Sequence, residues 1–216
     1  MLVPELPSRV YCIIDADRTG PDAVGLVRTA LQAGVGMILL RTPGLTTRQA
    51  LETGGALVGM TRAARTPLIM DARVDVCLAL GADGVHVESE DMPVAHARRL
   101  LGPAAIIGAT AATAHDAGIA QEDGATYVLA DAGGTLATAA SPKPDLEQLR
   151  RVTMSTALPA CVFTHVTPES LEALACEGAQ FICVCCATDA GDNPARGLRE
   201  AVELVGTYFK PRHIAP

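Results

Sequence analysis

The chain has 216 residues, of which 49% are hydrophobic, 19% are charged and 3% are aromatic. This composition is typical of a soluble globular protein and excludes an intrinsically disordered chain, because disordered sequences are poorer in apolar residues. The formal net charge is -7, and Lys143 and Lys210 are the only lysines. The sequence therefore contains no basic patch that could bind the phosphate backbone of a nucleic acid, and we expect no nucleic-acid partner.

The N-terminal sequence lacks the basic start, long apolar run and small-residue cleavage site of a secretory signal. No apolar run reaches the length of a membrane span, so we expect no membrane partner. The seven cysteines are an odd number, and Cys161, Cys183 and Cys185 lie in apolar segments. This pattern favours reduced thiols over a disulfide framework and predicts a cytoplasmic protein.

Eight short apolar runs, rich in β-branched residues, are predicted as strands. In chain order they are VYCIID from Val10, VGMILLR from Val35, PLIMD from Pro67, GVHVE from Gly84, AIIGAT from Ala105, TYVLAD from Thr126, PACVFT from Pro159 and QFICVC from Gln180. The runs are almost continuously apolar, as parallel strands are when helices cover both faces of their sheet.

Alanine- and leucine-rich segments follow these strands and are predicted as helices. Residues typical of helix starts precede or open several of them, at Thr46, Pro93, Thr167-Pro168 and Pro194. Glycines typical of helix ends follow several of them, at Gly81, Gly102, Gly124 and Gly178.

Eight strand-helix units of roughly 25 residues each predict an α/β fold, the closed (β/α)₈ TIM barrel. An open doubly wound sheet is the main alternative for the same pattern. No linker or shift in composition divides the chain, so a single domain over residues 1–216 is expected.

Asp71 lies at the end of the third predicted strand and Asp91 just after the fourth, where each strand connects to the following helix. In a parallel barrel this edge forms the active-site face. Carboxylate oxygens are ligands that Mg²⁺ prefers, often together with substrate phosphates. The two aspartates are therefore predicted metal ligands, although strand-end acids also cap helices without binding a metal.

The longest predicted loop runs from Asp131 to Pro144 and contains Gly133-Gly134. Its small residues would let backbone amides approach a phosphate, but the same composition suits a plain connection. Cys183-Val-Cys185-Cys186 contains a nominal Cys-x-x-Cys spacing without a second ligand pair, so we interpret it as core packing. Strand alternation predicts Cys183 and Cys185 on one face and Cys186 on the other.

Residues 68–110 resemble the central block of the thiamine phosphate synthase and thiazole tautomerase family; they read LIMDARVDVCLALGADGVHVESEDMPVAHARRLLGPAAIIGAT. The first two strands and the last two strand-helix units are similar to the same family. The resemblance implies a TIM barrel, a Mg²⁺ cofactor and a small phosphorylated heterocyclic substrate. It implies a transferase that joins a pyrimidine pyrophosphate to a thiazole phosphate and releases pyrophosphate, and a possible homodimer.

Some family motif positions match this sequence. Arg41 corresponds to the arginine of the family's Gln-x-Arg-x-Lys pyrophosphate motif, and Asp91 to the acidic metal ligand after the fourth strand. Thr110 takes the place of a serine near the thiazole. Thr138 is the threonine that remains of a Thr-x-Thr-Lys loop. The resemblance thus implies Arg41, Thr110 and Thr138 as substrate-binding residues, the first two also catalytic.

Other motif positions differ. Leu39 and Pro43 replace the glutamine and lysine of the pyrophosphate motif, and Asp71-Ala72 replaces an Asn-Asp pair. The chain therefore appears as a divergent member of the family. The remaining differences, with the family residues in parentheses, are Ala139 (lysine), Thr164-His165 (Gly-Gly) and Cys186 (serine).

Thr164, His165 and Cys186 still occupy family substrate-binding positions, so we expect Thr164 and Cys186 to bind substrate. His165 is a candidate general acid or base, with a loop histidine as the alternative. Three functions remain open: a divergent transferase, a non-catalytic ligand-binding or partner protein, or a different enzyme that uses His165, Cys186 or Asp131.

Overall fold

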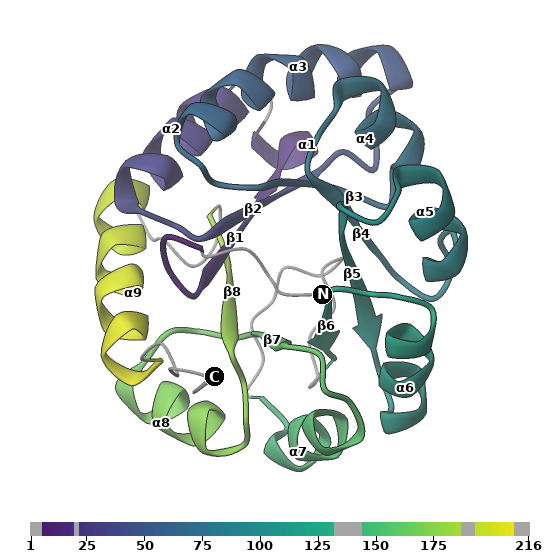
Figure 1. Ribbon diagram of the computed structural model, residues 1–216. Coiled ribbons are helices and arrows are strands. Elements are labelled where there is room, and N and C mark those ends of the chain that lie inside the picture. Colours follow the sequence, from purple (N-terminus) through teal and green to yellow (C-terminus); the bar gives the residue numbers. More distant parts are fainter. Residues whose placement is uncertain (1–5, 20–21, 132–143, 187–192, 210–216) are drawn as a thin grey trace.

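The computed structural model describes residues 6–19, 22–131, 144–186 and 193–209. Its parallel strands pair in the order β1 to β8 and close with β8 beside β1, which confirms the predicted TIM barrel and excludes the open sheet (Figure 1). The strands are β1 (Val10–Asp15), β2 (Met37–Arg41), β3 (Leu68–Asp71), β4 (Gly84–Val87), β5 (Ile106–Ala111), β6 (Tyr127–Ala130), β7 (Ala160–Phe163) and β8 (Phe181–Cys185).

Helices surround the barrel on its outer side (Figure 1). They are α1 (Ala16–Thr19), α2 (Ala23–Ala33), α3 (Thr47–Ala63), α4 (Val74–Leu80), α5 (Val94–Leu101), α6 (Ala114–Glu122), α7 (Leu146–Ser155), α8 (Pro168–Cys176) and α9 (Pro194–Tyr208). All eight predicted strands are thus confirmed within the described residues, each with small differences at its ends.

The helix starts predicted at Thr46 and Thr167 are confirmed by local hydrogen bonds, and Pro194 opens α9 as predicted, whereas Pro93 precedes the first turn of α5 and makes no side-chain capping bond. The Thr46 hydroxyl accepts the Gln49 amide and the Gln49 side chain accepts the Thr46 amide, which satisfies two amides at the start of α3. Thr167 caps α8 in the same way. At the helix ends, Gly81 adopts the left-handed conformation (φ 63°) that an L side chain rarely adopts.

Strand alternation divides the core into two parts. Residues that point outward, such as Ile38, Met70 and Val85, pack against the helices. Inward residues fill the barrel: Tyr11, Ile13, Met37, Leu39, Ile69, Ile106, Tyr127, Leu129, Cys161, Phe163, Phe181, Cys183 and Cys185. Large apolar side chains therefore close the interior, and any ligand site must lie at an end of the barrel.

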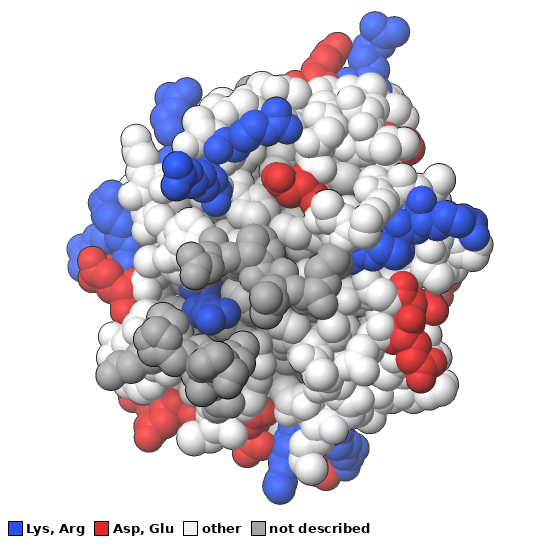
Figure 2. All heavy atoms as spheres, in the orientation of Figure 1, with Lys and Arg blue, Asp and Glu red and all other residues white. Residues whose placement is uncertain are grey.

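The cysteines follow the predicted alternation. Cys183 and Cys185 belong to the barrel interior, whereas Cys186 packs in the outer layer between sheet and helices. All cysteines are free thiols. Among the described residues no helix is long and apolar enough to cross a membrane. Figure 2 shows acidic and basic side chains scattered over the face that it presents, most of them near its rim.

Candidate active site

Polar residues replace the apolar ones in the layer of the barrel that lies at the carboxyl ends of the strands. Asp15, Arg41 and Asp71 end β1, β2 and β3, and Thr110 lies near the end of β5. By alternation these residues share the inward face with Ile13, Leu39 and Ile69. We call this end of the barrel, with these four polar residues, the mouth.

Arg41 is held between two carboxylates at the mouth. Its Nε donates to Asp71 Oδ2 at 2.9 Å, and its Nη1 donates to Asp15 Oδ2 at 3.2 Å. All three side chains are largely buried: Arg41 is 10% exposed, Asp71 12% and Asp15 7%. The orientation of the guanidinium is therefore fixed, because this planar group bonds two carboxylates at the same time.

Asp15 is a site residue that the sequence analysis missed. Its other oxygen, Oδ1, accepts the backbone amides of Asp17 and Arg18, so the same carboxylate caps α1 and orients Arg41. The available signal was its position, since Asp15 ends an apolar strand just as Asp71 does.

The mouth carries an excess of negative charge. Burial raises the pKa of the Asp71 carboxyl, and this effect outweighs the opposing pull of Arg41; Asp91 and Asp15 raise it further. Burial also raises the pKa of Glu88, with added repulsion from Asp71 and Asp91. Because these carboxylates repel one another across the mouth, a cation placed between them would be stabilised.

Asp91 lies in the turn between β4 and α5. Its Oδ2 accepts the backbone amide of Glu88 at 2.8 Å, so one oxygen orders this turn. In the described part of the chain, no group of three or more His, Cys, Asp or Glu residues is arranged to hold a metal. Mg²⁺ commonly takes only one or two carboxylates and completes its shell with water and phosphate oxygens. The donors Asp71 and Asp91 fit that pattern.

Ala72, directly after Asp71, adopts a left-handed backbone conformation with φ 59°. Because this conformation costs an alanine roughly 1–2 kcal/mol and a glycine little, Ala72→Gly is expected to raise the free energy of unfolding by about 1 kcal/mol. Denaturant unfolding measures the change. Ala64→Gly is the control: Ala64 has φ -83° and should gain no stability. Equal stabilisation of both variants would contradict the explanation.

A hydrogen-bonded chain leads from Thr110 into the barrel. Thr110 Oγ1 lies 3.0 Å from His86 Nε2, and His86 Nδ1 lies 3.1 Å from the Tyr127 hydroxyl. The Tyr127 hydroxyl lies 2.7 Å from that of Tyr11. Burial, and to a lesser degree Arg41, lowers the pKa of His86 to about 3. His86 is therefore a neutral imidazole at physiological pH, as expected of a structural histidine.

Gly108 makes room for this chain. A Cβ atom there would lie 2.1 Å from Tyr127 Cζ and 2.5 Å from His86 Nδ1. Gly108→Ala is therefore expected to lower the free energy of unfolding by about 3 kcal/mol, at the upper end of overpacking costs, since both rings are fixed in the core. Chemical denaturation provides the measurement. Gly118→Ala on α6 is the control because its Cβ would meet nothing within 4 Å, and an equal loss there would contradict this account.

A cavity of about 370 Å³ opens beside Thr110. Its walls come from the ends of β4, β5 and β6 and from α5 and α6. They combine apolar groups such as Val94 and Ile119 with five acids, Glu88, Asp91, Asp116, Asp123 and Asp131. The cavity thus joins the acidic mouth to an apolar wall, as a site for an aromatic ligand would.

The family model described as thiamine monophosphate synthase matches residues 10–188. The chain belongs to this family. A thiamine-phosphate synthase from Roseiflexus castenholzii is 37% identical over 198 residues, which cover 90% of this chain and 87% of the relative. The relative from Natronomonas pharaonis, with the same name, is 32% identical over 201 residues and covers 91% and 94%.

A solved structure agrees with the sequence relatives. Thiamine phosphate pyrophosphorylase from Pyrococcus furiosus has a TM-score of 0.79 and 29% identity, and the match covers 94% of this chain and 97% of that one. The protein is thus a thiamine-phosphate-synthase-like TIM barrel, as the resemblance implied.

Thr164, His165 and Cys186, which follow β7 and β8, were predicted as site residues from the resemblance. Thr164 is buried, and its hydroxyl donates to the His165 carbonyl at 3.3 Å. His165 is exposed and lines a separate cavity of about 240 Å³ with residues of α9 such as Leu198 and Glu200. His165 is therefore placed beside α9, away from the cavity that contains Thr110.

Cys186 follows β8 and is buried in the outer layer. A hydrogen bond with Cys12 lowers the pKa of the Cys186 thiol, against the effect of burial. Its predicted substrate contact stays a prediction. Thr138, the family's loop threonine, lies outside the described residues, as does most of the predicted loop from Asp131 to Pro144.

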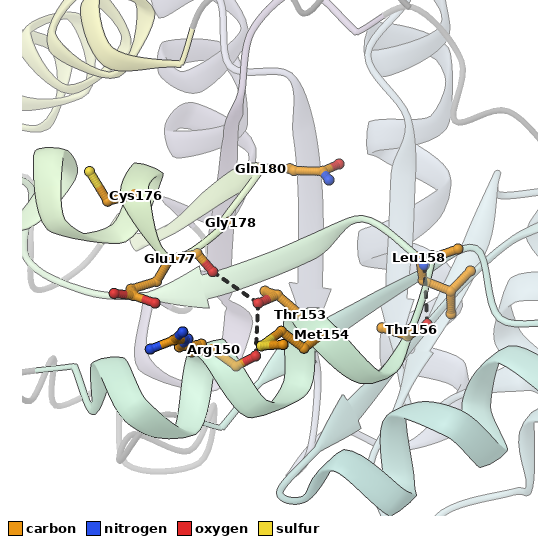
Figure 3. A pocket seen from close by; sticks show the side chains of 10 residues that line it. Arg150, Thr153, Met154, Thr156, Leu158, Cys176, Glu177, Gly178 and Gln180 are labelled. Carbon is orange, nitrogen blue, oxygen red and sulfur yellow. Dashed lines mark hydrogen bonds between the residues drawn. The ribbon is translucent and has the colours of Figure 1, made fainter.

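Another cavity, of about 390 Å³, lies far from these motifs, between the ends of α7 and α8 and the starts of β7 and β8 (Figure 3). Arg150, Met154 and Cys176 are among its lining residues, and Thr153 Oγ1 bridges the carbonyls of Arg150 and Glu177. This is the amino end of the barrel, where TIM-barrel residues serve stability, so the mouth is the better candidate for an active site.

Proposed function

We propose that the protein is a Mg²⁺-dependent transferase that joins a pyrimidine pyrophosphate to a thiazole phosphate. The carbon-oxygen bond to pyrophosphate breaks, and the thiazole nitrogen forms the new carbon-nitrogen bond. Pyrophosphate leaves with the bonding electrons. This reaction needs positive charge at the leaving group and no enzymic nucleophile.

Asp71 and Asp91 would hold Mg²⁺, which supplies charge stabilisation to the leaving pyrophosphate when bound. Arg41 is proposed to contact the same group. Its Nε and Nη1 are occupied by Asp71 and Asp15, so the guanidinium is held in one direction before substrate arrives. Such preorganisation lowers the reorganisation cost during the reaction. Thr110 is proposed to contact a heterocycle in the neighbouring cavity.

The observation that carries this proposal is the position of Arg41. By the resemblance it corresponds to the arginine of the family's pyrophosphate motif, and it lies buried at the mouth between two acids. Leu39 and Pro43 flank it in place of the motif's glutamine and lysine. Because one electrostatic contact of this kind is worth about 10²-fold in rate, we expect turnover well below that of family members with the full motif.

Ligand binding tests the proposed site. Thermal unfolding would be followed with pyrophosphate, thiamine phosphate or thiazole phosphate, each with and without Mg²⁺. A ligand that binds only the folded protein raises its midpoint, so a Mg²⁺-dependent increase is expected for the wild type and not for Asp91→Ala. Glu90→Ala is the matched surface control. No increase with any ligand at millimolar concentration would contradict the proposed site.

The replaced phosphate motifs favour one alternative, a family barrel that binds a ligand or partner without turnover. Thr164-His165 puts side chains where the family has Gly-Gly, so a phosphate cannot approach bare amides as closely there. Binding without product would support this alternative. A different reaction through His165 would instead be abolished by His165→Ala and not by Asp91→Ala. The single domain, the homodimer and the cytoplasmic location stay predictions.

A further inference from the structure

The hydrogen-bonded chain Tyr11–Tyr127–His86–Thr110 joins the barrel core to the mouth. Tyr11, Tyr127 and His86 are 1%, 2% and 0% exposed, so bulk water does not reach their hydrogen-bonding atoms. Thr110 is half-buried and lines the 370 Å³ cavity. The direction of the hydrogen bonds between these four side chains therefore decides whether the Thr110 hydroxyl donates a hydrogen bond to a ligand or accepts one.

The direction is set at the buried end. In the described structure, the Tyr11 hydroxyl has Tyr127 as its hydrogen-bond partner, at 2.7 Å. A buried hydroxyl proton without an acceptor is costly, so Tyr11 donates to Tyr127. Tyr127 then uses its own proton for His86 Nδ1. The reverse direction leaves the Tyr11 proton without an acceptor and is disfavoured by roughly tenfold or more.

His86 passes the direction on to Thr110. Its Nδ1 accepts from Tyr127 and therefore carries no proton, which leaves the ring proton on Nε2. Nε2 then donates to Thr110 Oγ1 at 3.0 Å. The hydroxyl proton of Thr110 is not used in this bond and is available to a ligand.

We propose that Tyr127 and His86 are positioning residues that make Thr110 a hydrogen-bond donor toward the ligand. The described lining of the cavity contains no basic side chain and five acidic ones, Glu88, Asp91, Asp116, Asp123 and Asp131. An uncharged acceptor, such as an unprotonated heteroaromatic nitrogen, therefore suits this position better than a phosphate oxygen. The inference rests on the proposed function only in taking this cavity as a ligand site.

The tautomer of His86 tests the direction without any ligand. In ¹⁵N-histidine-labelled protein, long-range ¹H–¹⁵N spectra distinguish a proton on Nε2 from one on Nδ1. The expected result is the Nε2–H form at neutral pH, in the wild type and in Tyr11→Phe, which leaves the Tyr127–His86 bond in place. An Nδ1–H form, or an imidazolium, in the wild type would overturn the proposal. A failure of the proposed function would leave this result unchanged.

Binding of 4-aminopyrimidine tests the donor role. At mildly alkaline pH its ring nitrogens are unprotonated acceptors, and titration calorimetry or NMR gives its affinity. Thr110→Ser keeps the hydroxyl and is expected to bind like the wild type, whereas Thr110→Val is expected to bind about tenfold more weakly. Circular dichroism confirms that both variants are folded. If Thr110→Val binds the probe as tightly as Thr110→Ser, or if the wild type does not bind it, the donor role is wrong.

Discussion

Arg41→Met is expected to lower the free energy of unfolding by about 3–5 kcal/mol. The substitution keeps most of the side-chain volume but leaves Asp15 and Asp71 buried at the mouth without their shared cation. A buried charge that loses its partner keeps its desolvation cost, and two such charges also repel each other. Urea unfolding at neutral pH measures the change.

Two controls separate this mechanism from a general loss of packing. Arg73→Met removes a more exposed arginine, paired with Asp75 at 2.7 Å, and should cost less than about 1 kcal/mol. Adding Asp15→Asn and Asp71→Asn to Arg41→Met removes the uncompensated charges, so most of the lost stability should return. A triple variant as unstable as Arg41→Met alone would show that packing, and not charge, explains the loss.

Acidification is expected to remove on the order of 5 kcal/mol of stability through His86 alone. The pKa of His86 is about 3 in the folded protein and 6.5 for an ordinary histidine. Below about pH 6.5, His86 becomes protonated in the unfolded chain but stays neutral in the folded protein. The contribution is therefore complete above that pH and is lost as the pH falls toward 3, at about 1.4 kcal/mol per pH unit.

The comparison with His86→Gln isolates this effect. Asp71 and Glu88, whose raised pKa values act in the opposite direction, are present in both proteins, so their contributions largely cancel. The stability difference between wild type and His86→Gln should shrink steadily between pH 6.5 and 4. His96→Gln, at an exposed position on α5, should follow the wild type. A pH-independent difference for His86→Gln would contradict the buried neutral imidazole.

The fold could be predicted because its signals are local. Each strand is a short apolar run, and helix starts such as Thr46 and Thr167 bind amides within their own first turn. Inward and outward faces follow from alternation, which also placed Cys183 and Cys186 on opposite sides. None of these features depends on a distant part of the chain.

The candidate site could be predicted only in part, since its contacts join distant segments. Arg41 and Asp71 were identified singly, but their bond, and the role of Asp15, depend on three strands meeting in the closed barrel. The left-handed backbone conformation of Ala72 could not be predicted, because the sequence has an alanine there and not the glycine that usually marks such a position. His165 ends a strand-like run, yet β7 stops at Phe163, so alternation no longer determines where its side chain points.

We propose that this barrel retains the family's reaction at the mouth. Purified protein would be incubated with the pyrimidine pyrophosphate, the thiazole phosphate and Mg²⁺, and thiamine phosphate and pyrophosphate would be quantified over time. We predict slow formation of both products in equal amounts by the wild type, and at least about 10²-fold less with Asp91→Ala. No product above the level of Asp91→Ala would contradict the claim.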